Sequence, residues 1–359
     1  MAVLNFTVGP VMSCSEVLHE GSMSAPYFRT PEFSKVMLQN EKIMLKMMYA
    51  PRGSRCVFLT ASGTGAMESA VMNILNHDDK VLVVNGGSFG QRFADLCRLH
   101  QLSYTEIPVE FGHQLKPEDL EHHAKQGYTA LLINMDETSS GTLYDMDLVS
   151  DFCKKEGILL IVDAVSAFIA DELNMEKLGA AAVLTGSQKG LAAYPGVSII
   201  VLSPTAQERV ENNREVCMYL SLKEALQNGI RGQTPFTPAV MTLLQINKRL
   251  RMIEAAGGVE KERAKIREIC QDFRSQMADL PFSFVSESMS NAVTALHPLH
   301  TRASDVVRIM KEDYHIWICP NGGDKVDEVF RVGHIGYIKM QDNKLLIKAF
   351  RNMRKRHVI

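Results

Sequence analysis

Residues 158–163 read Ile-Leu-Leu-Ile-Val-Asp, an apolar run that ends in a carboxylate. A strand with one face in water alternates apolar and polar side chains, whereas a run that is apolar throughout is typical of a strand covered on both faces. Similar runs occur at residues 56–60 (CVFLT), 81–84 (VLVV), 130–134 (ALLIN) and 197–202 (VSIIVL), with helical patterns between them, as at 66–75 and 93–99. This alternation predicts an α/β domain with a mostly parallel sheet.

The pattern changes after about residue 238. Two helical segments follow, residues 239–256 and a charged segment that runs to about 278, with Gly257-Gly258 between them. Short strand patterns (293–296, 316–319 and 328–332) then alternate with helical ones (303–312 and 341–353). We therefore expect an N-terminal arm over residues 1–20, a large α/β domain over 21–256 and a smaller α+β domain over 257–359.

The composition argues against several classes of protein. The 359 residues include 39 Lys and Arg against 41 Asp and Glu, a net charge of −2, so neither nucleic acid nor an anionic membrane is an expected partner. The seven cysteines form no CxxC pair, which favours reduced thiols over disulfides or a zinc site, and we expect no metal. No signal-peptide pattern and no run near the ~20 apolar residues of a membrane helix is visible. We expect a cytoplasmic protein.

Residues 60–68 (TASGTGAME) form a small-residue turn between a predicted strand and a predicted helix. Backbone N–H groups at a helix start bind anions, and the hydroxyls of Ser62 and Thr64 could add donors while Gly63 permits close approach. The pattern lacks the third glycine of a dinucleotide fingerprint and the lysine of a P-loop. On its own it is equally compatible with a structural turn.

Asp163 and Lys189 each follow an apolar run. A carboxylate beside apolar surface either caps the next helix or pairs with a cation. Lys189, in TGSQKG at residues 185–190, is either an ordinary loop lysine or an amine made nucleophilic by burial. Taken together, an anion site, a carboxylate and an amine at strand ends match the needs of pyridoxal 5′-phosphate (PLP), which has a phosphate, a ring nitrogen and an aldehyde.

These motifs, from VGP at Val8 to RVGHIG at Arg331, resemble those of the class V, fold-type I PLP-dependent aminotransferases. The resemblance is strongest to the branch of alanine/serine–glyoxylate and 2-aminoethylphosphonate–pyruvate aminotransferases. It implies that Lys189 carries PLP as an internal aldimine and moves the substrate proton. It also implies that Asp163 keeps the ring nitrogen protonated and that Arg331 binds the substrate carboxylate, a role suited to a planar guanidinium.

The resemblance supplies the remaining site residues. Its implied cofactor-binding set is Ser62, Gly63 and Thr64 with Gln188 at the phosphate, Phe89 stacked on the ring, Thr138 near the ring oxygen, Val165 under the ring, and Thr237 reaching the phosphate of a neighbouring subunit. Gly9 would line the substrate site. The role of Thr237 implies a homodimer.

Three functions remain open at this stage. The first is amino transfer from a small donor such as alanine or serine to a small 2-oxo acid such as glyoxylate or pyruvate, with 2-aminoethylphosphonate–pyruvate transamination as its alternative. The second keeps PLP but performs lyase or desulfurase chemistry. Phe89 and Gln188 stand where desulfurases of the family usually carry histidine, which disfavours that reading. The third is a phosphate-binding α/β protein without an imine.

Overall fold

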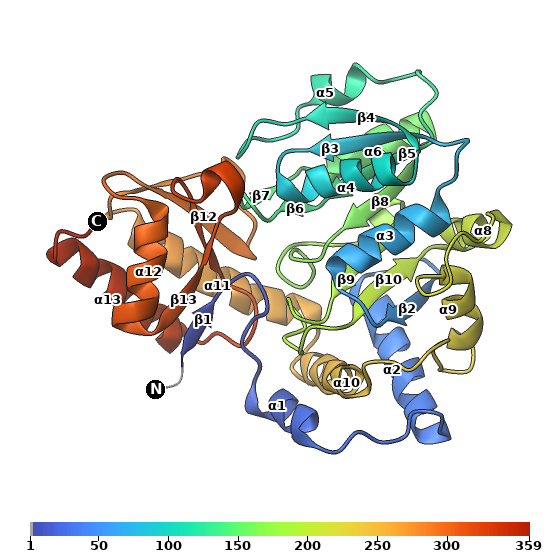
Figure 1. Ribbon diagram of the computed structural model, residues 1–359, viewed down its shortest axis with the longest axis horizontal. Coiled ribbons are helices and arrows are strands. Elements are labelled where there is room, and N and C mark those ends of the chain that lie inside the picture. The colour runs from blue at the N-terminus through green and yellow to red at the C-terminus, as the bar shows by residue number, and fades with distance from the viewer. Residues whose placement is uncertain (1–2) are drawn as a thin grey trace.

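The computed structural model describes residues 3–359, and residues 1 and 2 of the expected arm lie outside the described part. Two sheets form its framework, joined by long helices (Figure 1). The large sheet contains β2 (Arg55–Leu59), β3 (Lys80–Asn85), β4 (Ser103–Pro108), β5 (Ala130–Asn134), β8 (Leu159–Asp163), β9 (Ala180–Gly186) and β10 (Ser198–Leu202). The small sheet contains β1 (Leu4–Phe6), β11 (Phe282–Phe284), β12 (Val293–Pro298), β13 (Ile316–Pro320) and β14 (Phe330–Gly333), and a short hairpin is made by β6 (Asp136–Glu137) and β7 (Thr142–Leu143).

The large sheet has the order β2-β10-β9-β8-β5-β3-β4. The strands from β9 to β4 are mutually parallel, and β10 runs antiparallel to both of its neighbours. The prediction of a mostly parallel α/β sheet is confirmed. The carboxyl ends of β5, β8 and β9 consequently lie at one edge, with Asn134 paired to Asp163 in register.

Helices cover both faces of this sheet. The helices of the large part are α1 (Ser15–Ser22), α2 (Pro31–Met47), α3 (Gly63–Ile74), α4 (Ser88–Leu99), α5 (Pro117–Glu121), α6 (Met146–Glu156), α7 (Met175–Leu178), α8 (Pro204–Asn212), α9 (Leu222–Gly229) and α10 (Val240–Ala255). Residues of α3, α4, α8 and α9 pack in the core on one face, and residues of α2, α6 and α10 in the core on the other. Within β8, Leu160 and Val162 enter one core and Ile161 the other, which is why the run is apolar throughout.

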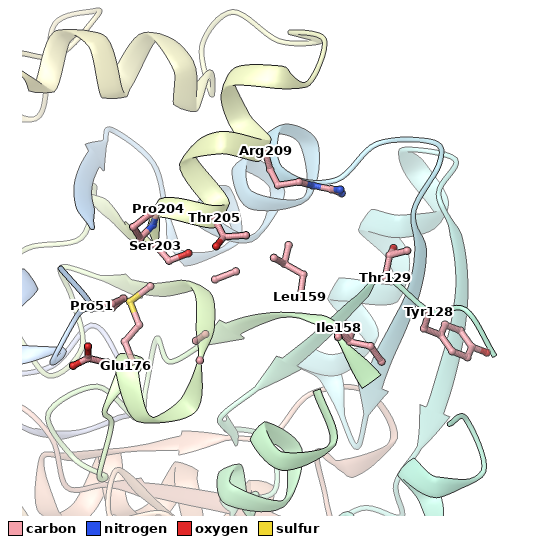
Figure 2. A pocket seen from close by; sticks show the side chains of 15 residues that line it. Pro51, Tyr128, Thr129, Ile158, Leu159, Glu176, Ser203, Pro204, Thr205 and Arg209 are labelled. Atoms are coloured by element: carbon pink, nitrogen blue, oxygen red, sulfur yellow. The ribbon is translucent and has the colours of Figure 1, made fainter. Parts of the chain in front are cut away.

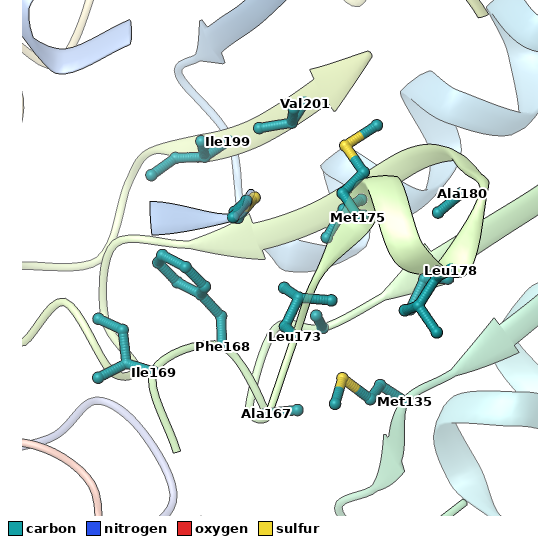
Figure 3. Packing of buried hydrophobic residues seen from close by; sticks show 14 of the residues in the cluster. Met135, Ala167, Phe168, Ile169, Leu173, Met175, Leu178, Ala180, Ile199 and Val201 are labelled. Atoms are coloured by element: carbon teal, nitrogen blue, oxygen red, sulfur yellow. The ribbon is translucent and has the colours of Figure 1, made fainter. Parts of the chain in front are cut away.

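Figure 3 shows part of one of these cores. Phe168 and Leu173, from the segment after β8, and Met175 of α7 belong to the same buried cluster as Ile199 and Val201 of β10. This packing holds the chain that leaves Asp163 against the sheet, so the carboxyl edge is built on a rigid base.

The small sheet has the order β1-β13-β14-β12-β11 and carries α11 (Val259–Met277), α12 (Ala303–Tyr314) and α13 (Met340–Lys355), with a 3₁₀ turn at Gly323–Lys325. Strand β1 pairs in parallel with β13, so residues 4–6 belong to the small sheet, as Figure 1 shows on its left side. Helix α11 contributes Val259 and Ile266 to one core of the large sheet, and Ile269, Phe273 and Met277 to a separate core that packs on the small sheet. The expected division at residues 256 and 257 stays a prediction. Within residues 3–359, no helix is both long and apolar enough to cross a membrane.

Candidate active site

Lys189 lies in the turn that follows β9, and the N-terminal loop packs directly on it. A Cβ placed on Gly9 would lie 2.7 Å from Lys189 Cδ and 2.9 Å from Cε, and Val11 N–H donates to the Gln188 carbonyl at 3.2 Å. Burial lowers the pKa of the Lys189 ammonium, Asp136 and Asp163 act to raise it, and Arg331 lowers it. The amine therefore sits among these charges rather than in a free surface loop, and a lowered pKa favours its nucleophilic form.

Asp163 ends β8 and is 4% exposed. Its Oδ1 accepts from the Val165 N–H at 2.8 Å and its Oδ2 from the Asn134 side-chain amide at 2.7 Å. Burial raises the pKa of Asp163 to about 6, against the lowering effects of these two hydrogen bonds and of Lys189. The contact with Val165 stabilises the turn after β8, but Asp163 does not cap the next helix, because α7 begins at Met175 and its N-cap is Asn174. The carboxylate retains lone pairs for a cation such as a protonated ring nitrogen.

The start of α3 is the expected anion site. Ser62 is its N-cap residue and is exposed, and among the described residues its side chain makes no capping hydrogen bond. The first N–H groups of the helix therefore remain available to an anion. A Cβ on Gly63 would lie 3.1 Å from Val165, so this position has little room for a side chain. The Arg92 guanidinium donates to Thr64 Oγ1 at 2.9 Å and adds a positive charge to the cradle.

Phe89 lies in the first turn of α4, where a buried carboxylate orders the backbone. Glu137 is 1% exposed and accepts from the N–H groups of Phe89 at 3.2 Å and Gly90 at 3.1 Å. The Arg92 guanidinium lies 4.8 Å from the centroid of the Phe89 ring. One arginine thus joins the expected stacking residue to the Thr64 hydroxyl of the anion site.

Arg331 extends from β14 of the small sheet to the loop between β6 and β7. It donates to the Thr138 carbonyl at 3.2 Å and to the Pro320 carbonyl at 2.8 Å, and its Nη2 lies 3.3 Å from Cys319 Sγ. Its Nε is buried and has no hydrogen-bond partner within the described chain. The guanidinium therefore has donor capacity left for a carboxylate beside Lys189.

The groups at this site match the chemical needs of bound PLP. The helix start offers donors for a phosphate, and Asp163 offers a carboxylate for the ring nitrogen. Two further buried atoms at this edge, Asn134 Oδ1 and Gln188 Oε1, have no hydrogen-bond partner anywhere in residues 3–359. Thr138 is buried and its carbonyl touches Arg331, so the expected ring-oxygen and carboxylate residues are neighbours.

Among the described residues of the single chain, Thr237 makes no hydrogen bond to the residues around Lys189. It is exposed and lines a small cavity of about 20 Å³ with Thr60, Tyr219 and Phe236. The functional roles of Thr237 and of the other predicted site residues stay predictions.

A separate cavity of about 660 Å³ lies at the opposite edge of the large sheet (Figure 2). It is lined by residues at the starts of β8 and β9, including Leu159 and Ala180, by Ser203 at the N-cap of α8 and by Arg209 in the last turn of α8. Arg209 is already paired with Asp79 and with the Ile74 carbonyl. Because ligands of parallel α/β sheets bind at the carboxyl edge, the Lys189 cluster is the candidate active site.

Comparison with known proteins agrees with this geometry. The family model described as aminotransferase class-V matches residues 20–330. The chain belongs to the class-V aminotransferase family. This aminotransferase is 30% identical to a protein described as the small subunit of a soluble hydrogenase from Synechococcus, over 89% of this chain and 85% of that protein. It is 29% identical to an L-aspartate–glyoxylate aminotransferase of Paracoccus denitrificans, over 92% and 86%.

The fold agrees as well. A structure described as a subgroup IV aspartate aminotransferase from Thermus thermophilus superposes with a TM-score of 0.91 at 26% identity, covering 98% of this chain and 99% of that one. The predictions of a fold-type I enzyme, of PLP as its cofactor and of a transaminase are confirmed.

Three contributors to the site were missed from the sequence: Arg92, Glu137 and Asn134. Arg92 follows Phe89 by three residues, one helical turn, and that spacing alone could have suggested contact with the ring. Glu137 and Asn134 act through residues 29 or more positions away, and no local signal identifies them.

Proposed function

We propose that this aminotransferase moves an amino group from a small donor, such as alanine or serine, to a small 2-oxo acid such as glyoxylate or pyruvate. The observation that carries the proposal is the placement of three groups. Asp163 ends β8, Lys189 lies in the turn after the neighbouring strand β9, and Arg331 bonds the Thr138 carbonyl from the small sheet while its buried Nε has no partner among the described residues. An amine, a carboxylate for a ring nitrogen and a guanidinium for a carboxylate are thereby available at one site, and both charged groups affect the pKa of Lys189.

Each residue has a distinct task. Bound PLP supplies the aldehyde that takes the amino group and the ring that delocalises the electron pair left at the substrate α-carbon. Lys189 removes the α-proton and returns it, a general acid–base role that its lowered pKa favours. Asp163 holds the ring nitrogen protonated, and the α3 N-terminus with Thr64 binds the phosphate. Arg331 binds the substrate carboxylate with two parallel donors.

The test is chemical trapping at Lys189. Borohydride reduction of the PLP-loaded protein followed by peptide mapping should place the label on Lys189, and Lys189→Ala should lose the half-reaction with every amino acid tried. The exposed Lys311 of α12 gives a matched control, because Lys311→Ala removes a lysine far from the sheet edge and should keep full labelling. Label elsewhere, or turnover retained in Lys189→Ala, would refute the assignment.

A titration of the cofactor spectrum with a panel of amines would identify the donor. Arg331 suits a phosphonate as well as a carboxylate, so 2-aminoethylphosphonate belongs in the panel as the alternative donor. Release of sulfide, ammonia or carbon dioxide in place of stoichiometric amination of the 2-oxo acid would instead support a desulfurase, lyase or decarboxylase.

A homodimer is the proposed quaternary state, with Thr237 reaching the phosphate in the other subunit. Exposed apolar side chains lie near Thr237. Tyr219 is 52% exposed and Phe236 38%, both line the same small cavity as Thr237, and their rings stack at 5.5 Å; Met218, next to Tyr219 in the sequence, is 78% exposed. A contiguous apolar patch of this kind favours burial against a second copy. Phe236→Asp should shift the sedimentation coefficient towards the monomer and weaken PLP binding. Leu99→Asp, which alters an apolar residue of α4 that is 62% exposed, is the control and should change neither.

Cytoplasmic residence is proposed from the thiols. All seven cysteines are free, and free thiols without disulfides are typical of proteins in a reducing compartment. Cell fractionation that recovered the enzyme with an extracytoplasmic marker would refute this.

A further inference from the structure

Asp136 is a buried carboxyl group that the proposed reaction does not use. It lies in β6, two residues before Thr138, and is 2% exposed. Its Oδ1 accepts from Ser166 Oγ at 2.6 Å. Its Oδ2 is buried and finds no hydrogen-bond partner in the part of the chain that the structure describes. A charged carboxylate with one unpaired oxygen is costly at such a place, whereas a neutral acid is much less so.

Ser166 links this carboxyl group to the active site. The Ser166 and Thr138 hydroxyl oxygens lie 2.6 Å apart, so Asp136, Ser166 and Thr138 form a continuous chain of hydrogen bonds. Each hydroxyl has a single proton to donate. When Asp136 is charged, Ser166 donates to it and Thr138 donates to Ser166, which leaves only acceptor lone pairs on the outer side of Thr138. When Asp136 is a neutral acid that donates to Ser166, the direction of both bonds reverses and Thr138 can donate outward.

Charged groups from several elements determine whether Asp136 is charged or neutral. Burial and the nearby carboxylates of Asp171 and Asp163 raise the pKa of Asp136 to about 7, while the hydroxyls of Ser166 and Ser290 act in the opposite direction. The other titratable groups that act on members of this cluster are Lys189, Arg331, Cys319, Glu137, Tyr144 and Arg274. Among the carboxylates, Asp136 has a larger effect than Asp163 on the charge of Lys189.

We propose that Asp136 is a positioning residue that holds a proton for the active site and, through Ser166, sets whether the Thr138 hydroxyl donates to or accepts from the group beside Lys189. This rests on the proposed function, in which Thr138 lies near the ring oxygen of the cofactor. A donating Thr138 stabilises that oxygen as an anion. An accepting Thr138 favours its protonated form, and the charged Asp136 then also favours a proton on the Lys189 nitrogen. The absorbance of the bound cofactor should therefore report the ionisation of Asp136, near neutral pH, as a second step.

The test compares pH titrations of the cofactor absorbance in three PLP-loaded proteins. The unaltered enzyme should show an ionisation near pH 7 in addition to that of the Lys189 nitrogen. Asp136→Asn keeps the shape of the side chain and should lose the neutral ionisation. Ser166→Ala keeps Asp136 but breaks the chain, and should also lose it. Ser139→Ala, which changes a hydroxyl next to Thr138 that bonds Glu137 instead, is the matched control and should keep it.

Retention of the neutral ionisation in Asp136→Asn would overturn the proposal. Its loss in Asp136→Asn with retention in Ser166→Ala would also overturn it, because Asp136 would then act through space rather than through the hydroxyls. A second readout uses cofactor-free protein: the infrared carboxylic-acid band assigned to Asp136 should be present at pH 6 and absent in Asp136→Asn. Absence of the band in the unaltered protein would overturn the proposal that Asp136 holds a proton. That result would leave the proposed function intact if borohydride labelling still identified Lys189, so the two failures can be told apart.

Discussion

Replacement of Gly9 by alanine should slow the catalytic step while leaving the enzyme folded. The added Cβ would lie 2.7 and 2.9 Å from Lys189 Cδ and Cε, where carbon atoms in ordinary contact are about 3.5–4.0 Å apart. The lysine side chain must therefore withdraw by about 1 Å. A displacement of about 1 Å in a reacting group costs up to about 100-fold in rate, or about 2.7 kcal/mol. We expect kcat to fall roughly 10–100-fold.

The backbone contributes a separate effect. Gly9 has φ of +133°, a region that costs other residues about 1–3 kcal/mol of stability. Gly196 is a matched control, because its φ is +128° and an added Cβ would meet only Ala239 at 3.9 Å. Urea unfolding should show similar losses of stability in the two variants, and single-turnover absorbance with an amino donor should be slow only in Gly9→Ala. Equal rates in the two variants would contradict contact between Gly9 and the catalytic amine.

Other perturbations should separate the remaining contacts. Arg92→Lys should raise the dissociation constant of PLP about 5-fold, measured by equilibrium dialysis, because it removes a hydrogen bond to Thr64 worth about 1 kcal/mol; unchanged affinity would contradict a role in the phosphate cradle. Arg331→Lys should raise KM about 10–100-fold for donors with a carboxylate, since a lysine cannot make two parallel hydrogen bonds; an unchanged KM with a reduced kcat would argue for a different role. Between pH 3.8, the usual pKa of Asp136, and its raised pKa of about 7, the folded cofactor-free protein binds more protons than the unfolded protein. The free energy of unfolding should therefore fall as pH rises across this window, by at most about 4 kcal/mol. In urea titrations, Asp136→Asn should flatten this slope, and an unchanged slope would contradict the raised pKa.

The sheet and the principal chemistry could be predicted because their signals are local. Runs such as ILLIVD are apolar at every position when both faces are buried, and Asp163 and Lys189 mark the ends of such runs. The order of the strands then carries their carboxyl ends to one edge. The first residues of helices are harder to predict from the sequence. Helix α4 begins at Ser88, five residues before the predicted Phe93, because Glu137 accepts from its first N–H groups from a distant part of the chain.

Contacts that close over long sequence separations could not be predicted. Strand β1 is only three residues long, and its place beside β13 depends on residues more than 300 positions away. Strand β10 is as apolar as the parallel strands of the same sheet, so its antiparallel direction has no signature in composition. The link from Asp136 to Ser166 spans 30 positions between two unremarkable polar residues. Tertiary packing alone creates these features.

The route of the N-terminal segment has a mechanical consequence. Leu4–Phe6 is hydrogen-bonded into the small sheet, whereas Val11 is hydrogen-bonded to the loop that bears Lys189. Residues 7–10 are thus a short tether anchored at both ends, and Gly9, in contact with the catalytic amine, lies within it. If the small sheet shifts when Arg331 engages a substrate, the tether must move with it. Binding of a substrate at Arg331 would then pull on the loop that bears Lys189. Glycines inserted into residues 7–10 should uncouple the movement of the small sheet from that loop.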